Sequence, residues 1–199
     1  MDNQNGARQP FTPITPPSWG AMACKRAFDI VCSLLGLVVL SPLLLVVSML
    51  VAVNSPGGVF FRQERIGKGG KPFRIFKFRS MRKDNAGLKI TTGNDSRITP
   101  VGRFLRKSKI DELPQLINVL VGDMSFVGPR PEVADYVSLY TPYQRQVLLV
   151  RPGITGLASI RFRNENDLLT ASDDPNRTYI EQIMQSVDTF IGEKAPIVA

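Results

Sequence analysis

The stretch that decides the fold is an uncharged apolar run at residues 30–53, which reads IVCSLLGLVVLSPLLLVVSMLVAV. As a straight helix its 24 residues would measure about 36 Å, enough to cross a bilayer. Ser41-Pro42 interrupts the run near its middle, and proline removes a backbone hydrogen bond and clashes with the preceding turn. We therefore predict a membrane-associated helix with a kink at Ser41-Pro42.

Basic residues flank this run on both sides. Two precede it, Lys25 and Arg26, and four follow it, Arg62, Arg65, Lys68 and Lys71. A single spanning helix would put one cluster on the wrong face of the membrane, because cytoplasmic flanks carry the excess of Lys and Arg. A helix that enters, breaks at Ser41-Pro42 and returns keeps both clusters cytoplasmic, and each half reaches roughly 18 Å. The flanks favour this re-entrant arrangement but leave a transmembrane span open, since proline also occurs in spanning helices.

The chain divides into three parts around this run. Residues 1–24 are predicted to be a disordered cytoplasmic tail, since their start is rich in Pro, Asn and Gln. Residues 25–56 are predicted to form the re-entrant hairpin, and residues 57–199 a small cytoplasmic domain. The length of 199 residues fits one domain plus a membrane element.

Charge is concentrated in one block of the chain. The net charge is +8, but residues 62–109 alone carry +12, so the remainder sums to −4. Such a block should meet anionic partners, namely lipid headgroups, nucleotides or nucleic acid, although a merely solvated basic face would look the same. No nucleic-acid recognition motif accompanies the charge, and a long apolar hairpin would serve no purpose in such a protein, so we expect no nucleic-acid partner.

The residue types that are missing narrow the chemistry. The chain has no histidine, which excludes Ser-His-Asp and Cys-His catalysis and zinc sites built on histidine. Its two cysteines, Cys24 and Cys32, fit neither a metal site nor a disulfide framework, so both are predicted to be reduced. Neither a Walker loop nor a Gly-x-Gly-x-x-Gly turn is present.

Local patterns after residue 56 predict a strand hairpin followed by helices. Gly57–Phe61 opens a short apolar strand, Arg65–Lys71 reads as a Gly-rich turn, and Phe73–Met81 alternates apolar and basic residues as a strand does. Thr99-Pro100 is typical of a helix start, with a cap followed by proline in the first turn. Pro175–Phe190 is predicted to be a polar helix.

An adjacent acid pair, Asp111 and Glu112, lies at the start of a further predicted helix. Ser108 to Asp111 has the spacing of a capping box, and apolar residues then recur at helical spacing until Gly122. In the first turn the helix dipole favours an ionised carboxylate, and an ionised Asp beside a basic block can attack phosphorus. Neighbouring helix residues differ by about 100° in direction, so a nucleophile and a metal ligand form a natural division of roles. The alternative is helix capping with surface salt bridges to Arg106 and Lys109.

Two rigid turns follow the acid pair. The prolines of Gly128-Pro129-Arg130-Pro131 stiffen a turn and fix the direction of Arg130, which suits a phosphate contact, although a rigid loop with a solvated Arg is equally compatible. Arg151–Gly156 reads as a tight, Gly-rich turn that could approach a ligand closely.

Taken together, these segments resemble the bacterial sugar transferase family, the small monotopic phosphoglycosyl transferases. The matching motifs include Lys25-Arg26-x-Phe28-Asp29, Ser41-Pro42, Phe76-Lys77-Phe78-Arg79-Ser80-Met81, Asp111-Glu112-Leu113-Pro114-Gln115-Leu116, Gly128-Pro129-Arg130-Pro131-Glu132 and Arg151-Pro152-Gly153-Ile154-Thr155-Gly156. The resemblance covers about residues 25–165, and its length and order make it far more specific than any single motif.

The resemblance implies a fold, a place and a reaction. The fold is a mixed, helix-rich α/β monotopic membrane protein, with a re-entrant helix broken at Ser-Pro and amphipathic interface helices. The expected place is the cytoplasmic face of the bacterial inner membrane, in contact with its lipids. The reaction moves a sugar-1-phosphate from a UDP-sugar to polyprenyl (undecaprenyl) phosphate and releases UMP, the first membrane step of surface-glycan, exopolysaccharide or glycoprotein assembly. Whether the protein forms a homodimer is left open.

The resemblance also implies roles for individual residues. Asp111 is the expected nucleophile, which forms an aspartyl-phosphosugar intermediate, and Glu112 the Mg²⁺ ligand. The predicted substrate and phosphate contacts are Lys77, Arg79, Arg106, Arg130 and Arg163. Fixed cations and Mg²⁺ would stabilise the charge on the transferred group.

The sequence departs from the family pattern at 157–164 and in a short C-terminal tail. The rival interpretation is therefore a catalytically silent membrane scaffold of the same fold. The identity of the sugar is open.

Overall fold

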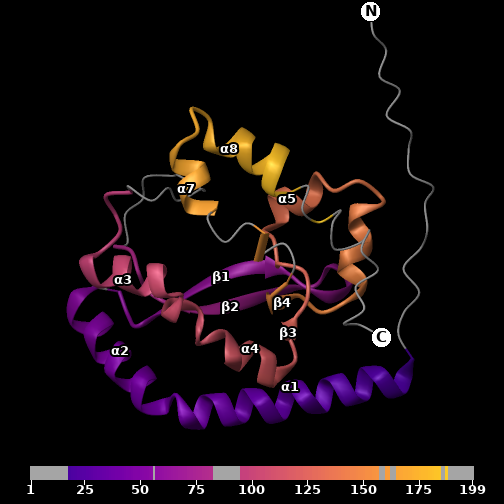
Figure 1. Ribbon diagram of the computed structural model, residues 1–199, viewed down its shortest axis with the longest axis horizontal. Coiled ribbons are helices and arrows are strands. Elements are labelled where there is room, and N and C mark those ends of the chain that lie inside the picture. Colours follow the sequence, from indigo (N-terminus) through magenta and orange to yellow (C-terminus); the bar gives the residue numbers. More distant parts are fainter. Residues whose placement is uncertain are drawn as a thin grey trace, which may run out of the picture.

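The elements form a mixed, helix-rich α/β fold, as predicted. The computed structural model describes residues 18–55, 57–82, 95–156, 160–161, 165–184 and 187. Figure 1 shows the long helices α1 and α2 along one side, the hairpin β1–β2 at the centre, and α7 and α8 on the opposite side.

The apolar run forms two helices with a bend between them. α1 spans Trp19–Val39, α2 spans Ser41–Asn54, and their axes differ by 63°. Ser41 Oγ donates to the carbonyl of Val38 at 2.7 Å, and Pro42 lies in the first turn of α2, where its missing N–H is not needed. The predicted break at Ser41-Pro42 is confirmed. The predicted disordered tail is wrong for residues 19–24, because Ser18 caps α1 by accepting from the N–H of Ala21.

Neither helix alone, within the part of the chain that the structure describes, has the length and apolar composition of a membrane span; the bent pair together does.

The hairpin that follows pairs β1 (Phe60–Ile66) with β2 (Pro72–Phe78) antiparallel, from Phe60 opposite Phe78 to Ile66 opposite Pro72. The connection contains the 3₁₀ turn η1 (Lys68–Gly70), where Gly69 and Gly70 adopt positive φ of 71° and 75°. The predicted turn at Arg65–Lys71 was too long, because Arg65 and Ile66 still pair with β2. Backbone pairing thus extends the first strand past the apolar residues from which it was predicted.

The acid pair lies between two helices. α3 (Pro100–Ser108) begins as predicted, with the Thr99 hydroxyl accepting from the N–H of Gly102 at 2.9 Å. Lys109, at a left-handed φ of 59°, ends α3, and the 3₁₀ turn η2 (Ile110–Glu112) follows before α4 (Gln115–Val121). The capping-box prediction is wrong: Ser108 closes α3, and its hydroxyl donates to the carbonyl of Phe104 at 2.8 Å. Gly122, at φ 100°, ends α4 as predicted.

A short parallel pair supports the Pro-Arg-Pro turn. β3 (Ser125–Val127) pairs with β4 (Gly153–Thr155), and α5 (Ala134–Ser138) and the 3₁₀ segment η3 (Gln144–Leu149) lie between them in sequence. The prediction of a turn at Arg151–Gly156 is thus wrong at its centre, which is a strand. Gly153 is required there, since a Cβ would lie 2.2 Å from the backbone nitrogen of Gly128.

Two short helices and a π turn form the described C-terminal part of the chain. α7 spans Glu165–Thr170 and α8 spans Pro175–Thr178, after which the chain widens into a π turn, η4 (Tyr179–Ile183). The predicted helix therefore begins at Pro175 but changes form at Tyr179, and its end at residues 188–190 lies outside the described residues.

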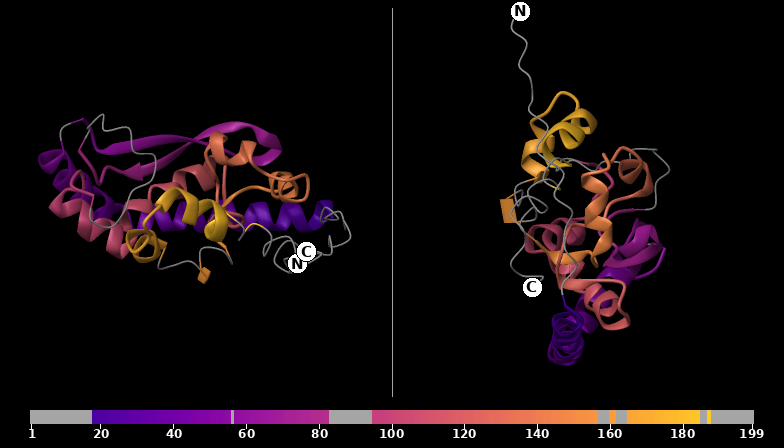
Figure 2. Two further views of the ribbon diagram at one scale, coloured as in Figure 1. Left: turned by 90° about the horizontal axis from the view of Figure 1, so that it is seen from above. Right: turned by 90° about the vertical axis from the view of Figure 1, so that its right-hand side faces the viewer.

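The hydrophobic core joins the helix pair to the rest of the molecule. Val47 and Val51 of α2 pack with Phe78 of β2 and Leu105 of α3. α1 packs along α4, where a Cβ on Gly36 would lie 3.2 Å from Leu116. The right-hand view of Figure 2 shows the pair along one side of the domain. One face of each helix packs on the domain, and the other is left exposed.

Candidate active site

The acid pair faces the central hairpin. Lys77 of β2 donates from Nζ to Oε1 of Glu112 at 3.0 Å, so a strand and the η2 turn meet at an ion pair. Both side chains are about one quarter exposed, at 23% and 27%. The structure brings together three of the predicted residues, Lys77, Asp111 and Glu112.

Asp111 is the buried member of the pair, with 6% of its surface exposed. Its Oδ1 has no hydrogen-bond partner. A buried oxygen without a partner costs folding free energy, and such groups are typical of functional sites. Burial raises the pKa of Asp111 to about 6, reinforced by the negative charge of Glu112 and opposed by Lys77. The predicted stabilisation of the ionised form by a helix dipole is wrong, because a three-residue turn replaces the first turn of a helix and the side chain is desolvated.

Glu112 behaves differently from its neighbour. Burial by itself favours the neutral acid, but the bonded ammonium of Lys77 outweighs it and lowers the pKa of Glu112. Burial likewise lowers the pKa of Lys77, against the attraction of Glu112. The two acids thus have opposite shifts, which is the usual sign of separate roles in one site.

A buried amide fixes the distance between the hairpin and the acid pair. Asn118 of α4 is fully buried; its Oδ1 accepts from the N–H of Phe76 and its Nδ2 donates to the carbonyl of Arg74, both at 2.9 Å. These bonds hold the free edge of β2 against α4, one residue from Lys77. Sequence reasoning missed this role, since only its position in a helical pattern was visible.

The Pro-Arg-Pro turn lies against the parallel strands. The N–H of Gly128 donates to the carbonyl of Thr155 at 3.0 Å, and the N–H of Gly153 donates to the carbonyl of Pro129 at 2.8 Å. The side chain of Arg130 is 38% exposed, and its NH1 lies 3.0 Å from Oε2 of Glu165 at the start of α7. Its charge acts on both Glu112 and Lys77, which places Arg130 in the electrostatic field of the acid pair.

The remaining predicted phosphate contacts have separate surroundings. Arg106 lies with NH1 3.8 Å from Sδ of Met81, and its charge acts on Asp111. Arg79 donates to the carbonyls of Gly57 and Gly58, each at 2.8 Å, which gives it a structural role at the start of β1. Arg163 lies outside the described residues. The phosphate contacts of these three arginines stay predictions.

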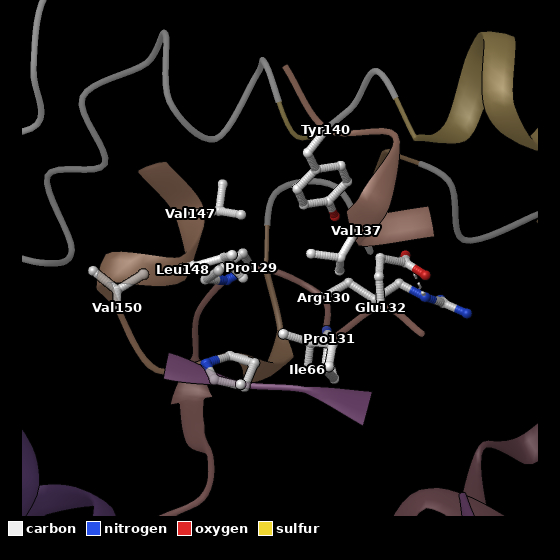
Figure 3. A pocket seen from close by; sticks show the side chains of 12 residues that line it. Ile66, Pro129, Arg130, Pro131, Glu132, Val137, Tyr140, Val147, Leu148 and Val150 are labelled. Atoms are coloured by element: carbon white, nitrogen blue, oxygen red, sulfur yellow. Dashed lines mark ion pairs between the residues drawn. The ribbon is translucent and has the colours of Figure 1, made fainter. Parts of the chain in front are cut away.

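A small pocket adjoins the Pro-Arg-Pro turn rather than the acid pair. It is lined mostly by apolar side chains, among them Ile66, Val137 and Val147. In Figure 3 the guanidinium of Arg130 and the carboxylate of Glu132 point away from this apolar space. The apolar side chains that line the pocket therefore pack under the turn, and its two charged groups lie outside the apolar space.

The donor set of the acid pair fits Mg²⁺. Among the described residues no group of three or more His, Cys, Asp or Glu gathers, which leaves no all-protein cage for a metal. Mg²⁺ prefers oxygen ligands and is commonly held by one or two carboxylates together with substrate phosphates. The unpartnered Oδ1 of Asp111 and the carboxylate of Glu112 meet that requirement.

Two largely buried carboxylates with opposite pKa shifts lie among fixed cations, an arrangement that suits chemistry on a phosphate group. Comparison with known families agrees: the model of the family described as bacterial sugar transferase matches residues 20–196, and the chain belongs to that family.

Curated relatives share this region. The chain is 44% identical over 177 residues to UDP-glucose:undecaprenyl-phosphate glucose-1-phosphate transferase of Escherichia coli K12, covering 85% of the chain and 38% of that protein. It is 44% identical to UDP-N-acetylgalactosamine-undecaprenyl-phosphate N-acetylgalactosaminephosphotransferase of Aeromonas hydrophila, covering 68% and 33%. It is 47% identical to exopolysaccharide production protein PSS of Rhizobium leguminosarum bv. phaseoli, covering 70% and 74%. The chain thus spans about a third of the length of the first two relatives.

Proposed function

We propose that this protein transfers a sugar-1-phosphate from a UDP-sugar to undecaprenyl phosphate, with release of UMP. The observation that carries the proposal is the buried Asp111 beside the Lys77–Glu112 pair, in a chain similar to proteins named for this transfer. The first membrane step of exopolysaccharide or surface-glycan assembly is the corresponding role.

In the first step a carboxylate oxygen of Asp111 attacks the phosphorus that carries the sugar. The bond from this phosphorus to the bridging oxygen breaks, and UMP leaves with the electron pair. The product is an aspartyl-phosphosugar ester. Lys77, Arg106 and Arg130 are among the cations whose charges act on the acid pair, and they would stabilise charge on the transferred group.

In the second step an oxygen of undecaprenyl phosphate attacks the same phosphorus. The bond between phosphorus and Asp111 breaks, which regenerates the carboxylate and yields undecaprenyl diphosphate-sugar. Lys77 ties the short η2 turn to β2 through Glu112, and Asn118 ties the adjoining helix α4 to the same strand. These contacts would keep Asp111 in one position for both attacks.

Glu112 is the residue proposed to hold Mg²⁺, with donor phosphate oxygens completing the set. When bound, the metal would supply Lewis-acid stabilisation of phosphate charge. The same carboxylate is paired with Lys77 in the structure, so Lys77 would exchange Glu112 for a phosphate oxygen when donor and metal bind.

We further propose that α1 and α2 enter the cytoplasmic leaflet of the bacterial inner membrane and return. Fourteen large apolar side chains of the pair are exposed, far more than scattered surface residues would give. Both helices also pack against the same domain, α1 on α4 and α2 on α3, which a straight span would not allow along its whole length. This arrangement would bring the lipid acceptor to the domain that holds Asp111.

The direct test is UMP release by the purified chain from UDP-glucose, UDP-N-acetylgalactosamine and other UDP-sugars, with Mg²⁺ and undecaprenyl phosphate. Asp111→Asn is the matched control, since an amide cannot form the ester. Release with one sugar that is lost in the control would support the proposal and identify the donor. Absence of release by the folded, lipid-bound chain with every donor would favour the silent scaffold.

A further inference from the structure

A buried glutamate lies behind the Pro-Arg-Pro turn. Glu132 is 5% exposed, and the Tyr179 hydroxyl donates to its Oε1 at 2.6 Å. Arg65 NH1 lies 3.5 Å from Oε2, and Arg130 Nε lies 3.9 Å from Oε1. The positive charge of Arg65 is enough to compensate the buried negative charge of Glu132. The second contact, with the partly exposed Arg130, therefore indicates that Glu132 does more than neutralise Arg65.

The guanidinium of Arg130 is held from two directions. Glu132 lies beside its Nε, and Glu165 lies at 3.0 Å from its NH1. The flanking prolines fix the backbone, so these two acids determine where the guanidinium points. An arginine that binds a diphosphate gains most when its fork is oriented before the ligand arrives.

Tyr179 in turn fixes the orientation of Glu132. The backbone of Glu132 is fixed to β1, since its carbonyl accepts from the N–H of Ile66 at 2.8 Å. This bond does not fix the rotation of the carboxylate, which depends on the side chains around it. The Tyr179 hydroxyl makes the shortest of the contacts to that carboxylate. Burial and the negative charge of Glu132 raise the pKa of Tyr179, so the hydroxyl remains a donor.

The C-terminal π turn delivers this hydroxyl. Tyr179 packs with Leu169 and Ile183, and its ring stacks on that of Tyr136 in α5 with centroids 4.8 Å apart. Figure 1 shows α8 reaching α5 at this point. The wider π turn is a rare helical form that is frequent at functional sites.

We propose that Tyr179 is a positioning residue for donor binding: its hydroxyl orients Glu132, and Glu132 orients Arg130 toward the diphosphate of the UDP-sugar. The proposal deepens the proposed function and rests on it. It makes the C-terminal π turn, far from Asp111 in sequence, part of the donor site.

The test is calorimetric binding of UDP, the donor without its sugar, to the full-length chain in detergent with Mg²⁺. Tyr179→Phe keeps the ring and its packing and removes only the hydroxyl. We expect its affinity for UDP to fall about ten- to hundred-fold, the value of a lost hydrogen bond to a charged group. Tyr136→Phe is the matched control, because its hydroxyl donates to Asn176 and not to Glu132, and we expect its affinity to change less than about two-fold.

The same two substitutions in an Arg130→Lys chain distinguish a positioning role of Tyr179 from a merely structural one. If Tyr179 acts through Arg130, Tyr179→Phe causes little further loss there, whereas general loosening of the fold would weaken binding equally in both backgrounds. Should Tyr179→Phe not fold, Glu132→Asp, which withdraws the acid by one methylene, must show the same loss. Unchanged UDP affinity in Tyr179→Phe, or equal loss in both backgrounds, would overturn the proposal. Failure of the unaltered chain to bind UDP would instead remove the proposed function, and this inference with it.

Discussion

At the scale of single residues, the buried carboxylate of Asp111 destabilises the folded chain at neutral pH. Its pKa of about 6 exceeds the ordinary 3.8, so the folded chain binds this proton more tightly than the unfolded chain. The resulting penalty is present above pH 6 and disappears as the pH falls toward 4, and it amounts to about 3 kcal/mol. Asp111→Asn removes it.

We therefore expect Asp111→Asn to raise Tm by about 6–12 °C at pH 8 without Mg²⁺, and the gain to vanish near pH 4. Thermal unfolding at both pH values measures it. A lower Tm for the variant at pH 8 would contradict a buried, destabilising charge.

Glu112 has the opposite environment and a separate prediction. Glu112→Gln keeps the shape but loses the charge that attracts both Lys77 and a metal. We expect UMP release by this variant to need about ten-fold more Mg²⁺ for half-maximal rate, as for loss of a carboxylate ligand. A Mg²⁺ titration identical to that of the unaltered chain would remove Glu112 from the metal site.

The sequence allowed the acid pair to be predicted, but not the environment of each acid. Asp111 and Glu112 were visible because a specific motif surrounds them. Lys77 was named through the resemblance, yet its pairing with Glu112 depends on how a distant hairpin meets η2, which no spacing rule gives. Glu132 and Tyr179 were missed as partners, because a contact between residues 47 apart has no local signal.

At the scale of elements, the attachment of β2 to α4 holds the site together. Asn118→Ala would leave the N–H of Phe76 and the carbonyl of Arg74 buried without these partners. We expect a loss of about 2–4 kcal/mol in the free energy of unfolding, measured by denaturant titration.

Val121→Ala is the control for this change, since Val121 lies on the same helix and is 63% exposed. It should cost less than about 0.5 kcal/mol. Equal effects of the two substitutions would show that Asn118 does not hold the hairpin.

Elements with local signals were predicted better than elements that depend on distant pairing. The start of α3 was correct because Thr99 and Pro100 form its cap themselves. β4 was read as a turn because its three residues become a strand only through pairing with β3, and the π turn at Tyr179 follows from packing against Tyr136.

At the scale of the whole molecule, the helix pair sets the topology. The basic flank at its start is bound to the domain: Arg26 donates to the carbonyls of Val119 and Leu120 at 2.6 and 2.8 Å, and Lys25 donates to the carbonyl of Val127 at 3.2 Å. The start of α1 therefore lies beside the domain, and the proposed re-entrant pair would keep both on one side of the membrane.

A cysteine at Gly20, where a side chain meets nothing within 4 Å, tests this in a chain with Cys24 and Cys32 replaced by serine. In intact bacteria we expect an impermeant maleimide in the periplasm not to label it, and in inverted vesicles the same reagent to label it fully. Labelling from the periplasm would require a spanning helix.

The measurement that bears most directly on the proposed reaction is the mass of the protein after incubation with its UDP-sugar and Mg²⁺ in the absence of undecaprenyl phosphate. We expect one equivalent of UMP to be released and the mass of one phosphosugar to be added to the peptide that contains Asp111, with neither in Asp111→Asn. Turnover with acceptor but no adduct and no UMP without it would contradict the covalent route through Asp111.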